Sequence, residues 1–305
     1  MDTAWLLDFV TLAEVNNFTR AAQIRHSSQA AFSRRIQALE AWVGAELIDR
    51  SVFPTRLTDE GSRFLEYALD ISQRVSDLRA DFSGRPSAWL SRIRIAAPHA
   101  LATGFLPRRW QEWVRGLAAL NCVINPANVH DAVTTFISGN ADLLVCFHNP
   151  QQPIHLDPEQ YQRLTLGVQM LRPYMSTSLH KKVRWSFPGT VEHPIPHLAY
   201  SQGAYLGRMV NLMMERANKP PYLVPHAESD MADVLRELAL NGHGVAWLPD
   251  CVAHSAERHG ALMCVSSDPA WELSLAVMAY RDKHNPSPAL QRLWRRLSSL
   301  YEVPA

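Results

Sequence analysis

The apolar positions near the start of the chain recur with the period of an α-helix. Between residues 27 and 43 they lie at i, i+4, i+7 and i+11, which places them on one helical face at ~100° per residue. These apolar residues are Phe32, Ile36, Leu39 and Val43. A similar stripe between residues 5 and 13 predicts an earlier helix, and a short helix from about Thr19 to Arg25 lies between the two. The pattern predicts a helix-turn-helix, whose second helix enters the major groove of DNA.

The polar face of the 27–43 segment carries side chains that are typical of DNA readers. Arginine pairs with guanine and glutamine with adenine at base edges in the major groove. Either serine that follows His26 is suited to cap the helix, and free amides at a helix N-terminus bind phosphates. The DNA contacts predicted on this segment are Ser27, Ser28, Gln29, Ala31, Ser33, Arg34, Arg35 and Gln37. The alternative is an amphipathic helix that simply faces solvent.

The segment that follows Gly44 predicts a wing. Pro54 lies in its middle, and Arg50 and Arg56 flank that proline. Arginines on a short hairpin contact phosphates beside the groove without reading the sequence. Residues 1–58 contain six arginines and six acidic residues, so DNA binding depends on where the charges lie. The whole chain, at a net charge of +1 and a pI near 7.8, likewise lacks the basic field of a nonspecific nucleic-acid binder.

Residues 59–83 predict a long helix with a dimerisation seam. Their apolar positions step by 4, 3, 4, 3 and 4, which is the heptad spacing of a coiled coil. The seam consists of Phe64, Ala68, Ile71, Val75, Leu78 and Phe82. A homodimer joined along this helix has a two-fold axis, which requires a pseudo-palindromic operator in double-stranded DNA. The alternative is a helix that packs on its own domain.

Strands and helices alternate from residue 88 onward, which predicts an α/β region with a mostly parallel sheet. The pattern restarts near residue 198, so we predict two lobes. Lobe I comprises residues 91–162 and 268–305, and lobe II comprises residues 163–267. Extended crossovers at Gln160–Thr177 and Ser266–Tyr280 join them. The predicted domains are therefore a DNA-binding domain at 1–58, a linker helix at 59–87 and an effector-binding domain at 88–305.

A cleft between the lobes is the expected ligand site. In open α/β sheets ligands lie beyond the carboxyl ends of the strands, where helix N-termini offer free amides. The junction residues selected by this rule are Pro98, His99, Ala100, Leu101, Asn128, Phe147, His148, Ser201, Gln202, Val245 and Ala246. The two histidines are suited to donate to a polar or anionic effector, although a histidine in a loop is more often structural. The identity of the effector is not encoded in these residues.

Signals for other kinds of chemistry are missing from the sequence. There is no Gly-x-Ser-x-Gly elbow, no Gly-x-x-x-x-Gly-Lys loop and no His-Glu-x-x-His, so we expect no catalytic residues and no cofactor. The cysteines at 122, 146, 251 and 264 lack Cys-x-x-Cys spacing, which predicts reduced thiols and no metal site. No run of 18 apolar residues occurs and the N-terminus lacks a basic leader region, which predicts a cytoplasmic protein outside the membrane. The rival interpretation is a two-lobed small-molecule binding protein or enzyme with an appended DNA-binding-like helical domain.

The N-terminal segment resembles the LysR-type transcriptional regulators. The matching positions are Phe9, Ala13, Phe18, Thr19, Ala21, Ala22, Ser28, Gln29, Ala31, Ser33, Arg34, Ile36, Leu39, Glu40, Gly44, Leu47, Arg50, Leu57, Thr58 and Gly61. Ala30 and Ile48 depart from the family, which usually has proline and phenylalanine there, and the run from 242 to 249 matches a recurrent family segment. The resemblance implies an N-terminal all-α winged helix-turn-helix, a linker helix and a periplasmic-binding-protein-like (type 2) regulatory domain. It also implies a homodimer or homotetramer that regulates transcription.

Residues 200–211 and the run that ends at Pro249 look like the hypochlorite-responsive subgroup of that family. This closer resemblance implies that a small-molecule effector or an oxidant modulates the regulator. Oxidation converts methionine into a polar sulfoxide. The methionines of this region are Met209, Met213, Met214 and Met231. The alternative is that they fill the core.

Overall fold

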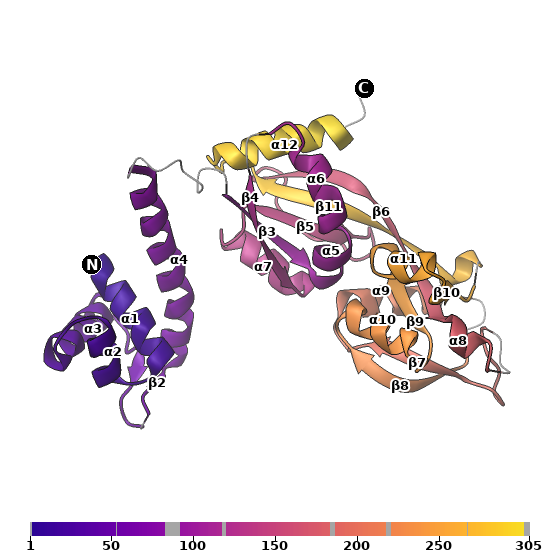
Figure 1. Ribbon diagram of the computed structural model, residues 1–305, viewed down its shortest axis with the longest axis horizontal. Coiled ribbons are helices and arrows are strands. Elements are labelled where there is room, and N and C mark those ends of the chain that lie inside the picture. The colour runs from indigo at the N-terminus through magenta and orange to yellow at the C-terminus, as the bar shows by residue number, and fades with distance from the viewer. Residues whose placement is uncertain are drawn as a thin grey trace. The chain divides into compact units, whose positions relative to one another are not determined.

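The computed structural model describes residues 2–52, 54–82, 92–117, 120–183, 187–217, 221–266 and 268–301. The chain divides into two compact units, Met1–Trp89 and Leu90–Ala305 (Figure 1). The first unit is helical with a small hairpin, and the second is an α/β structure. The finer division at residues 58 and 87, and the bounds of the two lobes, stay predictions.

The described part of the N-terminal unit consists of four helices and a two-stranded hairpin. Its elements are α1 (Thr3–Val15), α2 (Phe18–Ile24), α3 (Gln29–Val43), β1 (Ile48–Asp49), β2 (Arg56–Leu57) and α4 (Asp59–Phe82). The side chains of Asp2, Asn17 and Ser28 accept backbone N–H groups and so cap α1, α2 and α3. Asn16 and Gly44 adopt left-handed backbone at φ 51° and 80°, which ends α1 and α3. The predicted helix-turn-helix and its wing are therefore confirmed.

The apolar faces of α1, α2 and α3 form the core of this unit. Phe9, Phe32 and Leu39 are fully buried, as the helical periodicity predicts. Gly61, in the first turn of α4, lies directly against the backbone carbonyl of Leu47, where a Cβ atom would overlap the oxygen. This close approach holds the start of α4 against the strand that leads into the hairpin.

The first half of α4 packs on α1, which differs from the predicted seam. The rings of Phe9 and Phe64 meet edge to face with centroids 5.3 Å apart, and Ala68 is fully buried. Ala68 is therefore unavailable to a partner helix, and the alternative of a helix packed on its own domain holds for this half. The helix α4 has 24 residues and α1 has 13, so at ~1.5 Å per residue α4 is the longer helix. Figure 1 shows that α4 extends past α1. The side chains of Leu78 and Phe82 lie outside the described residues.

The C-terminal unit is built on a curled sheet that helices cover. Within the described residues the larger sheet has the strand order β10-β6-β11-β5-β3-β4, with β9 also paired to β6, and a second sheet pairs β7 with β8. The strands are β3 (Arg92–Pro98), β4 (Asn121–Ala127), β5 (Leu143–His148), β6 (Tyr161–Ser176), β7 (Ile195–Tyr200), β8 (Leu223–Ser229), β9 (Ala246–Pro249), β10 (Leu262–Cys264) and β11 (Leu273–Asp282). The helices are α5 (His99–Gly104), α6 (Leu106–Val114), α7 (Val129–Ile137), α8 (Thr177–His180), α9 (Tyr205–Arg216), α10 (Ala232–Leu240), α11 (Asp250–Arg258) and α12 (Pro288–Tyr301), with a 3-10 turn η1 (Pro269–Trp271).

The prediction of a mostly parallel sheet is wrong. β3 pairs in parallel with β4 and β5, and β7 pairs in parallel with β8, as strand-helix-strand units require. β6 and β11 pair antiparallel with each other, because the two segments predicted as crossovers are long strands that run in opposite directions. They add further antiparallel pairs with β5, β9 and β10. The sheet is therefore mixed, and β11 followed by α12 returns the chain to lobe I as predicted.

Among the described helices, none has the length and apolar character needed to cross a bilayer.

Candidate DNA interface and ligand cleft

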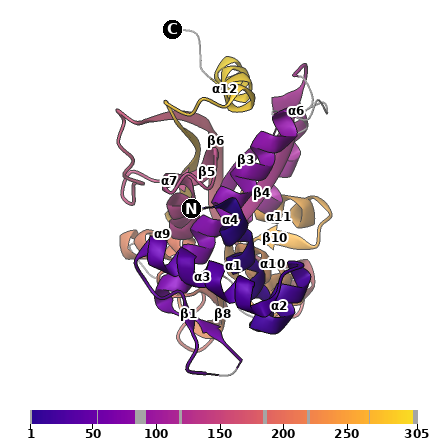
Figure 2. The ribbon, with the colours of Figure 1, turned by 90° about the vertical axis from the view of Figure 1, so that its left-hand side faces the viewer.

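The outer face of α3 is a polar surface next to the hairpin. Arg34 and Gln37 are exposed on this face, while the opposite face of the helix lies in the core. The predicted DNA contacts that the structure leaves exposed or half-buried here are Ser27, Ser28, Gln29, Ala31, Ser33, Arg34 and Gln37. The β1–β2 hairpin projects from the helices in both views of the unit (Figures 1 and 2). A capped helix start, a polar outer face and a projecting hairpin are the parts that a winged reader of the major groove needs.

Arg50 differs from the expected free arginine of the wing. Its Nη2 atom donates to Oε2 of Glu40 at 2.6 Å, while Oε1 of Glu40 accepts the N–H groups of Leu47 and Ile48 at 2.9 and 3.1 Å. Glu40 is buried, so its carboxylate ties the start of the hairpin to α3. Arg56 on β2 is exposed. The Arg50 side chain remains 37% exposed while it contacts Glu40, so both arginines of the wing are accessible and Arg50 also stabilises the fold.

Arg35 lies on the flank of α3 and not on its outer face. Its Nε atom donates to Oδ2 of Asp8 at 2.5 Å, and Nε of Arg25 donates to Oδ1 of the same carboxylate at 2.8 Å. Asp8 is only 1% exposed, so α1 contributes a buried carboxylate to the helix-turn-helix. Sequence reasoning missed both Asp8 and Arg25. A signal was available, because Asp8 directly precedes Phe9 on the core side of α1, where a charged residue needs a partner.

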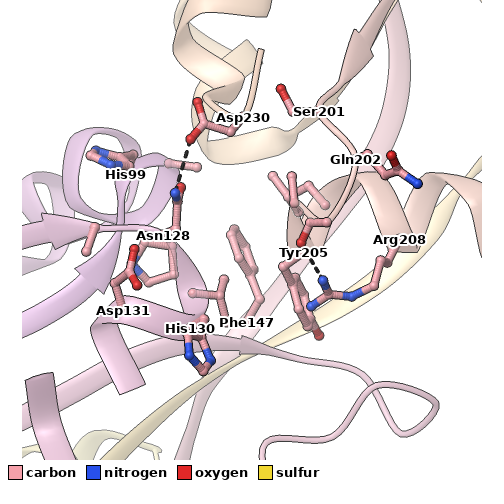
Figure 3. A pocket seen from close by; sticks show the side chains of 17 residues that line it. His99, Asn128, His130, Asp131, Phe147, Ser201, Gln202, Tyr205, Arg208 and Asp230 are labelled. Atoms are coloured by element: carbon pink, nitrogen blue, oxygen red, sulfur yellow. Dashed lines mark hydrogen bonds between the residues drawn. The ribbon is translucent and has the colours of Figure 1, made fainter. Parts of the chain in front are cut away.

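A cavity of about 610 Å³ lies between the two predicted lobes of the C-terminal unit. Its walls come from junctions between strands and helices. The predicted effector residues that line it are Pro98, His99, Ala100, Asn128, Phe147, Ser201 and Gln202. Figure 3 shows His99 and Asn128 on one wall, with Ser201 and Gln202 on elements of the facing wall. The rule that ligands lie beyond the carboxyl ends of strands thus selected the residues around this cavity.

The other predicted effector residues do not belong to the cavity wall. Leu101, Val245 and Ala246 are fully buried in the apolar core. His148 follows Phe147 on β5, and neighbouring residues of a strand point to opposite faces of a sheet. Burial and the nearby Arg163 lower the pKa of His148, which favours its neutral form near pH 7. Leu101, His148, Val245 and Ala246 therefore do not line this cavity, and their contact with an effector stays a prediction.

Sequence reasoning missed the charged residues of the cavity. The additional polar or charged side chains in its wall are His130, Asp131, Tyr205, Arg208 and Asp230. Asp131 lies three residues after Asn128 in α7, and Arg208 lies three residues after Tyr205 in α9. Residues at i and i+3 share one face of a helix. Extending the junction at Asn128 by one helical turn would have found Asp131, whereas Arg208 lies in the first turn of α9, six residues beyond Gln202.

Polar contacts connect the lobes at this cavity. Nδ2 of Asn128 donates to Oδ2 of Asp230 at 3.1 Å (Figure 3), and Oγ1 of Thr103 donates to Oδ2 of Asp233 at 3.1 Å. Asn128 occupies the N-cap position of α7 without capping it, since its amide is directed to Asp230. The contacts join α5 and α7 of lobe I to residues at the start of α10 in lobe II.

Both signs of charge face the cavity. The guanidinium of Arg208 donates to the carbonyl oxygen of Gly203 and lies 5.8 Å from the centre of the Tyr205 ring. Asp131 lies on the opposite wall (Figure 3). A cavity with a guanidinium on one side and a carboxylate on the other is suited to a polar ligand with hydrogen-bonding groups.

The cysteines lie in surroundings that disfavour a reactive thiolate. The four cysteines are free thiols. Burial raises the pKa of Cys146 and of Cys251 to about 12, whereas reactive cysteines have a lowered pKa. Met209 and Met213 are buried in the core, in agreement with the alternative considered for the methionines, whereas Met214 and Met231 are half-buried. Within the described ranges, no group of three or more His, Cys, Asp or Glu side chains is arranged to hold a metal ion.

Comparison with known proteins gives matches to both units. The bacterial regulatory helix-turn-helix proteins of the lysR family match residues 3–62, and the LysR substrate binding domain matches residues 88–301. The HTH-type transcriptional regulator YjiE of Escherichia coli (strain K12) is 30% identical over 302 residues, which cover 98% of this chain and 95% of that protein. DarR of Vibrio fischeri, solved in complex with DNA, is 30% identical with a TM-score of 0.62 and matches over 97% of this chain and 98% of that one. Full-length HypT of Salmonella typhimurium, a hypochlorite-specific LysR-type regulator, is 30% identical with a TM-score of 0.57 over 98% of each chain.

Proposed function

Because the chain belongs to the LysR family of transcriptional regulators, we propose that it binds operator DNA through α3 and the β1–β2 wing and responds to a small molecule in its inter-lobe cavity. DNA binding is supported above all by the exposed outer face of α3, which presents Arg34 and Gln37. Ser28 caps the N-terminus of the same helix. The relatives found by comparison are named transcriptional regulators, and DarR was solved on DNA. The protein is therefore a regulator and not an enzyme.

The proposed DNA contacts fall into two groups. Gln29, Arg34 and Gln37 read base edges, because they lie on the exposed face that enters the groove. Ser27 and Ser28, with the free amides at the start of α3, contact phosphates. The short side chains of Ala31 and Ser33 let the helix approach the DNA backbone closely, and the hydroxyl of Ser33 donates to a phosphate. Arg56 adds a phosphate contact from the wing.

We place the dimer contact on the second half of α4. Ala68 is buried in its own unit and Ile71 packs in part against the same core, so the seam lies beyond Ala68, with the half-buried Ile71 and Val75, and continues to Leu78 and Phe82. A homodimer, or a homotetramer made of two such dimers, binds a pseudo-palindromic operator because its two α3 helices are related by a two-fold axis.

The effector we propose is a small polar molecule whose identity is unknown. The cavity offers a guanidinium from Arg208 and carboxylates from Asp131 and Asp230, so a ligand with groups for both signs of charge is the best match. HypT is hypochlorite-specific, but the buried positions of Met209 and Met213 favour a reversible effector over oxidation at these residues. A DNA-binding regulator of this kind works in the cytoplasm, where its operator is.

The proposal is tested with the full-length chain and the DNA upstream of its own gene. Fluorescence anisotropy compares that duplex with an unrelated duplex of equal length and base composition. We expect tighter binding to the upstream duplex by at least ~10³-fold, which is the lower end for specific over nonspecific binding. Equal binding to both duplexes would contradict a sequence-specific regulator and would favour the rival two-lobed binding protein.

A further inference from the structure

A buried carboxylate in α1 binds two arginines of the helix-turn-helix. Asp8 is 1% exposed, and its oxygens accept Nε of Arg25 at 2.8 Å and Nε of Arg35 at 2.5 Å. Each oxygen thus serves one arginine. The arrangement connects α1 to the residue that ends α2 and to the second turn of α3.

Both guanidinium groups keep donors that the carboxylate does not use. A guanidinium has five N–H donors, and each arginine gives Asp8 only the one on Nε. In the described part of the chain, the terminal nitrogens of Arg25 and Arg35 donate no hydrogen bond to another residue. The side chains are 30% and 33% exposed, so these terminal nitrogens remain accessible to an external acceptor.

The position of the two arginines points to the phosphate backbone of DNA. Arg25 immediately precedes the turn that leads to Ser28, the cap of α3. Arg35 follows Arg34, about 100° around the helix from the proposed base-reading face. Residues that flank a recognition helix contact the phosphates on the edges of the groove. Planar guanidinium groups suit such contacts, because two N–H donors match two phosphate oxygens.

We propose that Asp8 is a positioning residue that holds Arg25 and Arg35 as a preformed pair of phosphate contacts beside the recognition helix. The inference rests on the proposed binding of DNA through α3. It goes beyond that function, because it assigns a role in DNA affinity to an acidic residue that never touches DNA. It also assigns Arg35, one of the DNA contacts predicted from the sequence, to the phosphate group.

The direction in which DNA affinity changes, when one negative charge is removed, distinguishes a positioning role of Asp8 from a purely electrostatic effect. Removing a carboxylate raises the net positive charge of the domain, and attraction to DNA alone then predicts tighter binding. Loss of positioning predicts weaker binding, because both arginines lose their fixed orientation. Asp8→Asn is therefore compared with Glu46→Gln, which removes the same charge from an exposed side chain of the same unit.

The measurement is the affinity of the full-length protein for a generic duplex at several salt concentrations, with the melting temperature recorded for each variant. We expect Asp8→Asn to bind at least several-fold more weakly than the unmodified protein. The slope of log affinity against log salt concentration should become shallower by up to ~1.8, which is ~0.9 for each phosphate that an arginine no longer neutralises. Glu46→Gln should bind equally well or more tightly. A lower melting temperature alone does not produce this difference in salt dependence at a temperature where both proteins are folded.

Single arginine variants keep the test decisive if Asp8→Asn does not fold. Arg25→Gln and Arg35→Gln each leave Asp8 with one partner, and each should lower the salt dependence by ~0.9 on any duplex sequence. Unchanged salt dependence in both, or an Asp8→Asn protein that binds as tightly as Glu46→Gln, would overturn the inference while leaving DNA binding itself intact. Failure of the unmodified protein to bind any duplex would instead reject the proposed function.

Discussion

The two units of this protein place their charged residues differently. In the N-terminal unit the buried carboxylates of Asp8 and Glu40 hold arginines in fixed positions. In the cavity of the C-terminal unit, Asp131 and Arg208 lie on opposite walls. Duplex DNA offers the same phosphate geometry at every turn, so a rigid arrangement of cations suits it. A small ligand can supply the partners that these two charges lack across the cavity, so Asp131 and Arg208 can lie apart in its absence.

The largest effect is expected where a fixed carboxylate is removed. Glu40→Ala leaves Arg50 and the N–H groups of Leu47 and Ile48 without their acceptor, and the N-terminal unit should lose ~3–5 kcal/mol of unfolding free energy. Urea unfolding followed by circular dichroism measures this loss. Glu46→Ala, at an exposed site, should change stability by less than ~0.5 kcal/mol. Equal, small effects of both substitutions would contradict the rigid account of this unit.

Acid should destabilise the C-terminal unit through His197. Burial lowers the pKa of His197 from 6.5 to about 4, and its ring packs edge to face on Trp247. Between pH 6.5 and about 4 the unfolded state binds a proton that the folded state does not, so the free energy of unfolding falls as pH is lowered, by at most ~3 kcal/mol. His197→Phe should remove this pH dependence in thermal unfolding. The exposed His193→Gln should retain it, and a reversed pattern would exclude His197 as the cause.

The seam on α4 is tested by a charge in its second half. Val75→Asp should raise the dissociation constant of the dimer by at least ~100-fold, or ~2.8 kcal/mol, because a carboxylate is buried without a partner. Ser62→Asp introduces the same charge on an exposed position of the first half and should leave the dimer intact. Analytical ultracentrifugation over a range of concentrations distinguishes the two. Dimers that survive Val75→Asp would move the interface away from this helix.

The smallest effect is expected at the contact between the lobes. Asn128→Ala removes one hydrogen bond to Asp230 and should lower stability by only ~0.5–1.5 kcal/mol. Urea unfolding of the full-length protein, followed by the fluorescence of its tryptophans, measures this change. A decrease as large as that expected for Glu40→Ala would mean that the cavity is as rigid as the DNA-binding unit, and the comparison between the units would fail.

Much of the fold was predictable from local patterns. The apolar spacing of Phe32, Ile36 and Leu39 located α3, and either serine after His26 was expected to cap it, as Ser28 does. These features depend on residues close together in the chain. The direction of β6 and β11 in the sheet was not predictable, because pairing between segments about a hundred residues apart leaves no trace in either segment alone.

The candidate sites divide in the same way. The exposed face of α3 follows from one helical period, so Arg34 and Gln37 were found. The hydrogen bond from Arg35 to Asp8 joins two helices through residues that are 27 positions apart in the sequence. The periodicity of a single helix does not predict such pairs. In the cavity, the junction rule found Asn128 but did not extend into the helices that carry the charges of Asp131 and Arg208.

The most direct test of the central claim is the preference of the protein for its operator after removal of one side chain on the outer face of α3. Anisotropy titrations with the upstream duplex and with an unrelated duplex are run for the unmodified protein, Arg34→Ala and Arg56→Ala. We predict that Arg34→Ala lowers the difference between the two binding free energies by ~1–3 kcal/mol. Arg56→Ala should weaken binding to both duplexes alike and leave the ratio of the two affinities unchanged. An Arg34→Ala protein with an undiminished ratio would contradict the claim that α3 reads the sequence of the DNA.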